Sequence, residues 1–199
     1  MVCWPIVLHH VVVRYACIAI TGRFQPFHRD HLDLVMHGLT LADRAIIGIT
    51  NPDSRSFKAV ATSAHRHQPS ANPFTYLERL RIIDAAMQAA AVSTARYEVV
   101  PFPLHDPGVW ADYIPYSIPQ LVRAFSDWER DKSRALQRGG YSVELLEGDP
   151  QQKIAASDVR AAMATGQSWQ HWLPKGAAAA LESISGASLQ QRCARLDHE

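Results

Sequence analysis

The chain has 199 residues, 47% of them hydrophobic, so it can bury the core of one ordinary domain. Its 20 Lys and Arg side chains face 19 Asp and Glu side chains, a formal net charge of +1. This balance argues against bulk binding to nucleic acid or to an anionic membrane, so any cationic site must be local. The three cysteines fit neither a disulfide framework nor a paired metal motif, which favours a reducing cytoplasm.

Residues 1–13 form an apolar leader whose status the sequence leaves open. No Lys or Arg precedes the apolar run, which is too short to span a bilayer and lacks a small-residue cleavage pattern. It fits an extra strand, a leader, or the product of an upstream start codon. We therefore expect no membrane partner.

Short apolar runs and helical patterns alternate along the rest of the chain. Strands are predicted at 14–20, 45–50, 97–101, 121–125 and 141–146, and helices at 30–40, 74–87, 109–113, 127–138 and 157–164. The polar stretch 53–71 lacks periodicity and predicts a long loop of the kind that binds or covers ligands. Mostly helix is predicted from residue 174 onward.

This alternation predicts an α/β fold with a single doubly wound parallel sheet and C-terminal helices. The domain is expected to span residues 14–184 and to end in a polar tail at 185–199. In such sheets the ligand lies at the carboxyl ends of the strands. The apolar helix at 176–184 fits either the core or a subunit interface, which leaves a homo-oligomer open.

The stretch with the clearest chemistry is ITGRFQPFHRDH, residues 20–31. It joins a strand, a glycine turn at Gly22 and a helix start, where free N–H groups and the helix dipole favour an anion. Arg23 adds a cation, and His28 and His31 lie on one face of the first helical turn. These features suit a nucleoside triphosphate. A zinc site would need a third ligand and a more usual spacing, and two structural histidines are the simpler alternative.

A second anion site is predicted at the helix near residues 157–164. Ser157 is a natural N-cap, so that the helix would present N–H groups to a phosphate. Arg160 lies one turn further and can reach the same anion with its planar guanidinium. The alternative is an ordinary capped helix with a solvated arginine.

TGRFQPFHRDH resembles the signature of the HxGH nucleotidyltransferases, in the GRFQPFHxGH form of the archaeal-type nicotinamide-nucleotide adenylyltransferases. Residues 72–79 (NPFTYLER) resemble the NPFT-x-x-ER helix start of that family, and residues 153–160 (KIAASDVR) resemble its ISGT-x-x-R motif. Gly166 to Trp169 and Leu173-Pro174 match the G-x-x-W…P pattern that follows. The resemblance covers about residues 14–184.

The resemblance implies an enzyme with a Rossmann-like fold that transfers a nucleotidyl group, in the leading interpretation AMP from ATP. The acceptor would be a small phosphorylated molecule such as nicotinamide or nicotinate mononucleotide, and pyrophosphate would leave. Mg²⁺ would be carried mainly by the triphosphate, without a dedicated protein metal site. The implied nucleotide site comprises Gly22, Arg23, Phe24, His28, His31, Ser157 and Arg160, with His28, His31, Arg23 and Arg160 catalytic. The implied acceptor site comprises Asn72, Arg79 and Trp110, although Trp110 fits the core equally well.

Three departures from the family pattern keep other functions open. Asp30 replaces the glycine of HxGH, Ala155-Ala156 replace the Ser-Gly of ISGT, and the acceptor region around Trp110 matches only loosely. The first alternative is a CTP-dependent cytidylyltransferase acting on a small phosphonate, phosphate or alcohol. The second is a catalytically weak nucleotide-binding regulatory module.

Overall fold

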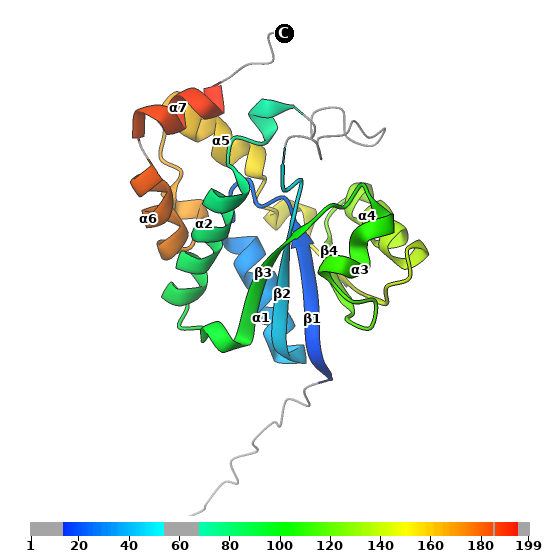
Figure 1. Cartoon of the computed structure of the whole chain (residues 1–199). Helices are drawn as coiled ribbons and strands as arrows, with labels where there is room; N and C mark the ends of the chain where they lie inside the picture. Colours follow the sequence, from blue (N-terminus) through cyan, green and yellow to red (C-terminus); the bar gives the residue numbers. More distant parts are fainter. Residues whose placement is uncertain (1–13, 54–67, 185, 195–199) are drawn as a thin grey trace, which may run out of the picture.

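Five parallel strands form one sheet in the order β3-β2-β1-β4-β5 (Figure 1). The computed structural model describes residues 14–53, 68–184 and 186–194; the leader 1–13 and most of the loop predicted at 53–71 lie outside them. The strands are β1 (Tyr15–Gly22), β2 (Ala42–Thr50), β3 (Tyr97–Phe102), β4 (Gln120–Ala124) and β5 (Val143–Glu147). All five predicted strands are therefore confirmed. Strand order reverses between β1 and β4, the position at which doubly wound sheets bind ligands.

The helices also follow the prediction closely. They are α1 (Arg29–Leu41), α2 (Tyr76–Ala89), α3 (Trp110–Tyr113), α4 (Asp127–Arg138), α5 (Ala156–Thr165), α6 (Lys175–Ile184) and α7 (Gly186–Ala194). Local chemistry explains their ends. Thr75 and Glu78 form a capping box at the start of α2, because each side chain accepts a hydrogen bond from the backbone N–H of the other residue. Gly166, with φ of 70°, ends α5 in the left-handed conformation that glycine favours.

Helices cover both faces of the sheet. The larger core lies between the sheet and the helices α1, α2, α5, α6 and α7, while α3 and α4 cover the other face (Figure 1). The central strand β1 is buried on both faces, and Ile18, Ala19 and Ile20 are at most 1% exposed. Burial on two faces explains why β1 and the second half of β2 are continuous apolar runs rather than alternating patterns.

The chain beyond residue 184 differs from the predicted polar tail, because residues 186–194 form helix α7. Leu189 is buried in the larger core, and the Cys193 sulfur lies 3.9 Å from that of Met163 in α5. The guanidinium of Arg192 pairs with Glu78 at 2.6 Å and donates to the carbonyl of Pro73. Tertiary contacts of a few residues thus order a segment whose composition indicates a tail.

Close backbone packing joins α6 to α2. A Cβ atom added to Gly176 would lie 1.9 Å from the carbonyl oxygen of Ala85, so only glycine permits this approach. Among the described residues no helix has the length and apolar character needed to cross a membrane.

Candidate active site

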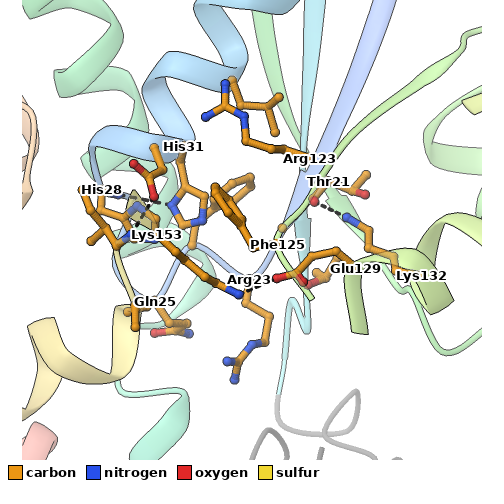
Figure 2. Close-up of a pocket in the computed structure, with 18 of the residues that line it drawn as sticks. Thr21, Arg23, Gln25, His28, His31, Arg123, Phe125, Glu129, Lys132 and Lys153 are labelled. Carbon is orange, nitrogen blue, oxygen red and sulfur yellow. Dashed lines mark hydrogen bonds and ion pairs between the residues drawn. The ribbon is translucent and has the colours of Figure 1, made fainter. Parts of the chain in front are cut away.

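A pocket of about 390 Å³ opens at the carboxyl ends of β1 and β4. Its wall comes from the turn after β1, the first turn of α1, the end of β4, the first half of α4 and the start of α5 (Figure 2). The sequence stretch 20–31 therefore lies at the edge of the sheet where the fold predicted a ligand.

A buried arginine holds the turn that follows β1. The backbones of Phe24 and Asn51 adopt the left-handed region, with φ of 52° and 49°, which side chains disfavour. The Arg79 guanidinium donates to the carbonyls of Arg23 (2.9 Å), Thr50 (2.8 Å) and Asn51 (2.7 Å). Burial lowers the pKa of Arg79 to about 10, so it remains a cation at neutral pH. Arg79 thus holds the carboxyl ends of β1 and β2 together.

The amide of Gln25 ties the same turn to the segment before α2. Its Nε2 donates to the carbonyl of Phe74 at 2.9 Å, and its Oε1 accepts from the N–H of Phe74 at 3.0 Å. Gln25 is only 2% exposed. The NPFT segment therefore supports the pocket from outside it.

His28 and His31 stack face to face at the start of α1. Their ring centroids lie 3.6 Å apart, and the His28 N–H donates to Nδ1 of His31 at 3.2 Å. Because Nδ1 of His31 accepts this bond, the neutral ring carries its proton on Nε2 and can donate there. Burial and then Lys153 lower the pKa of His28 to about 3, and burial, followed by His28, holds the pKa of His31 well below its ordinary value. Both rings line the pocket as neutral groups.

Two hydrogen bonds join the turn and α1 to α5. The Asp30 carboxylate accepts from the N–H of Ile154 at 2.7 Å, and the Arg160 guanidinium donates to the carbonyl of Gln25 at 2.8 Å. Asp30 therefore turns its carboxylate toward the segment before α5. Arg160 lines the pocket.

The predicted capping role of Ser157 is wrong. The N-cap of α5 is Ala155, which has no side-chain oxygen and an extended backbone (φ −88°, ψ 121°), so the N-cap lies two residues before Ser157. Ser157 is an exposed residue of the first turn, with Oγ 3.4 Å from Asp158 Oδ1. Ala155, Ala156 and Ser157 nevertheless line the pocket, so the start of α5 faces it.

Positive charge gathers at this pocket in an almost neutral chain. The charged residues lining it are five cations (Arg23, Arg123, Lys132, Lys153 and Arg160) and two carboxylates (Asp30 and Glu129). The carboxylates are engaged. Although burial alone would raise the pKa of Glu129, the Lys153 ammonium at 2.7 Å and the Ser126 hydroxyl hold it below its usual value. The pocket suits a polyanion. Its cations are gathered locally, as expected of a cationic site in a chain whose acidic and basic residues are balanced.

Sequence reasoning missed three of these cations. Lys132 donates to the carbonyl of Thr21, and Arg123 and Lys153 flank the histidine pair (Figure 2). In the charged pattern of residues 127–138, Lys132 resembles its solvated neighbours, and only the position of α4 against β1 distinguishes it. Lys153 begins the late motif, which was the available signal for it.

The three residues assigned to the acceptor do not line the pocket. Trp110 is 2% exposed, stacks on Phe102 and donates from Nε1 to the carbonyl of Pro103 at 3.0 Å, so it belongs to the smaller core. The Arg79 guanidinium donates its hydrogen bonds to backbone carbonyls, and the Asn72 amide donates to the carbonyl of Gln68 at 2.9 Å. In this structure the three residues therefore make structural contacts outside the pocket rather than lining it.

A doubly wound sheet that brings two neutral histidines and a helix start to one cationic pocket defines a nucleotidyltransferase type of enzyme. The chain belongs to the cytidylyltransferase-like family, whose model matches residues 19–162.

Its relatives include a cytidylyltransferase and an adenylyltransferase. The chain is 33% identical to the phosphonoformate cytidylyltransferase of Streptomyces viridochromogenes over 80% of its own length and 86% of that protein. It is 26% identical to the nicotinamide-nucleotide adenylyltransferase of Thermococcus kodakarensis, over 83% of this chain and 81% of that one.

A solved structure shares the fold. A bifunctional NMN adenylyltransferase/ADP ribose pyrophosphatase of Francisella tularensis, complexed with AMP and a Mn ion, matches 90% of the chain with a TM-score of 0.62 and 17% identity. The chain spans about half of that protein, 52% of its length.

Proposed function

We propose that this protein transfers a cytidylyl group from CTP to a small acceptor that carries a phosphonate or phosphate, with release of pyrophosphate. Nucleotidyl transfer as such rests on the histidine pair facing the start of α5 across a cationic pocket. The donor and the acceptor class rest on the 33% identical cytidylyltransferase and on the burial of Trp110. Without Trp110, the pocket lacks the aromatic side chain assigned to a pyridine ring.

In this proposal the triphosphate lies between α1 and α5. His28 and His31 donate to oxygens of the α- and β-phosphates, and Arg23, Arg160 and the start of α5 at Ser157 hold the β- and γ-phosphates. The acceptor oxygen attacks the α-phosphorus in line, and the bond to the pyrophosphate oxygen breaks. The residues act by positioning the reactants and by stabilising charge that develops on the phosphate. The neutral His31 ring suits this role because its Nδ1 accepts the backbone bond and its Nε2 carries the proton that it can donate.

The carboxylates of the pocket bear on whether the protein itself would hold a metal ion. Asp30 and Glu129 already accept from Ile154, Ser126 and Lys153, and the described residues contain no group of three or more His, Cys, Asp or Glu side chains able to hold a metal. The pocket therefore fits a Mg²⁺ ion that enters with the triphosphate rather than one held by a carboxylate cage. Bound in that way, Mg²⁺ neutralises part of the phosphate charge.

A second candidate is adenylyl transfer from ATP to nicotinamide or nicotinate mononucleotide. The adenylyltransferase relatives and the GRFQPFH stretch favour it. In that case the pyridine ring would meet pocket residues other than Trp110.

Pyrophosphate release decides between the two. The purified protein with Mg²⁺ is given each of CTP, ATP, GTP and UTP, paired with phosphonoformate, a simple phosphate ester, nicotinamide mononucleotide or nicotinate mononucleotide. Release with CTP and a small acceptor supports the proposal, whereas release only with ATP and a pyridine mononucleotide establishes the second candidate. Silence in every pair favours a regulatory nucleotide-binding module. The His28→Asn/His31→Asn double variant controls for a contaminating activity.

A further inference from the structure

Asp30 stands where the family signature has glycine, and its carboxylate joins two segments that are 124 positions apart in the sequence. We propose that Asp30 is a positioning residue, which anchors the segment before α5 on the first turn of α1 and so sets the width of the triphosphate site. The inference rests on the proposed nucleotide site and adds to it a determinant of nucleotide affinity.

The anchor acts at the point where α5 lacks a cap of its own. Ala155 is the N-cap and has no oxygen to offer the first turn, since alanine replaces the serine of the family motif. The Asp30 bond to the N–H of Ile154 fixes the backbone one residue before that N-cap. Two departures from the family signature are thereby related through one contact.

The bond also determines what the neighbouring residues can do. Lys153 precedes Ile154, and its ammonium lies 2.7 Å from Glu129 and 5.4 Å from the centre of the Phe125 ring, inside the pocket (Figure 2). Arg160, at the start of the second turn of α5, donates to the carbonyl of Gln25. Asp30 and Arg160 thus hold α5 at two points against the stretch that carries the histidines.

A carboxylate beside a triphosphate would ordinarily repel it. Here three features reduce that cost: the Ile154 N–H at 2.7 Å, the cations Arg123 and Lys153 close to the carboxylate, and the position of Asp30 in the first turn of α1, where the helix dipole favours negative charge. The geometry is that of a side chain retained for its hydrogen bond rather than for its charge.

Four single variants separate the hydrogen bond from the charge. Asp30→Gly restores the family residue, Asp30→Ala removes the acceptor with less loss of helix propensity, and Asp30→Asn keeps an acceptor without the charge. Asp33→Asn is the matched control, because Asp33 is exposed one turn along α1 and outside the pocket. Each variant is tested for the KM for CTP and ATP, for kcat at saturation, and for hydrogen exchange of the Ile154 amide without nucleotide.

We expect Asp30→Gly and Asp30→Ala to raise the KM for the nucleoside triphosphate roughly tenfold while kcat falls less than about threefold, and to speed exchange of the Ile154 amide by a similar factor. Asp30→Asn should stay within about twofold of the parent protein in all three measurements, as should Asp33→Asn.

The inference is overturned if Asp30→Ala keeps the parent KM and the parent exchange rate, or if Asp30→Asn is as impaired as Asp30→Ala. The second result would indicate a role for the charge, such as holding a cation. Amide exchange needs no substrate, so an unprotected Ile154 amide would refute the anchor even if nucleotidyl transfer is confirmed. An intact anchor in a protein that turns over no nucleotide would instead refute the proposed function.

Discussion

His31 receives a hydrogen bond from the backbone N–H of His28, 3.2 Å from its Nδ1, while the two rings stack 3.6 Å apart. The backbone bond determines the tautomer of His31. Because the two rings stack, a proton on one ring makes protonation of the other unfavourable. Phe24 and Phe27 complete the packing, with centroids 5.0 Å and 5.6 Å from the His31 ring. The pair is therefore a rigid, neutral donor group at the helix start.

Removing the His31 donor should reduce turnover more than binding. We expect His31→Ala to lower kcat by about 10²-fold to 10³-fold, in the range found when one transition-state donor is lost, and to raise the dissociation constant of the nucleotide less than about tenfold. Steady-state kinetics and calorimetric titration with the nucleotide measure the two effects. His37→Ala, on the same helix outside the pocket, should change neither. Equal losses in binding and turnover would contradict the assigned role.

The buried pair also predicts how stability depends on pH. Both folded-state pKa values are lowered by burial, that of His28 to about 3, so the unfolded chain binds protons at these positions that the folded protein does not. The free energy of unfolding should therefore rise with pH up to about 6.5 and then level off. Between pH 7.0 and pH 5.5 we expect a loss of about 2 to 3 kcal/mol in urea unfolding experiments.

Substitution of one ring tests the source of that pH dependence. His28→Asn keeps a residue suited to the N-cap and should reduce the loss between pH 7.0 and pH 5.5 by about half. His171→Asn, at an exposed position, should leave it unchanged. A free energy of unfolding that is the same at both pH values would mean that the rings take up protons in the folded protein as readily as in the unfolded chain.

Arg79 should prove to be a stability determinant. Arg79→Met leaves the carbonyls of Arg23, Thr50 and Asn51 buried without their donor, and we expect a loss of about 3 to 5 kcal/mol in the free energy of unfolding. Arg81→Met, exposed on the same helix, should change it by less than about 0.5 kcal/mol. If chemical denaturation gives similar free energies of unfolding for Arg79→Met and Arg81→Met, the protein does not depend on Arg79 to hold the turn after β1.

The position of Trp110 predicts a structural effect without an effect on the acceptor. Trp110→Phe loses the bond to Pro103 and part of the core volume, so we expect a loss of about 1 to 3 kcal/mol in stability and an unchanged KM for the acceptor. Trp128→Ala is the comparison, because Trp128 lines the pocket and its loss should raise the KM of a substrate at least about fivefold. A large rise in acceptor KM for Trp110→Phe alone would place the acceptor against that ring.

Local sequence predicted the five strands, most of the helices and the histidine pair. Apolar runs marked the strands, of which the central β1 is buried on two faces, and GRFQPFHRDH placed His28 and His31 together because residues i and i+3 are neighbours on a helix. The place of that stretch at the carboxyl edge of the sheet followed from the topology of doubly wound folds.

Tertiary structure decided which charged and aromatic side chains line the pocket. Burial places Trp110 and Arg79 outside it, and the approach of α4 and of the segment before α5 brings Lys132 and Lys153 to it. The sequence cannot show these outcomes, because they depend on which face of each element packs against the sheet and on contacts between residues far apart in the chain. The hydrogen bond from the Ile154 N–H to Asp30 is such a contact. Because of this bond, a residue that looks unfavourable in the sequence acts as a structural anchor in the fold.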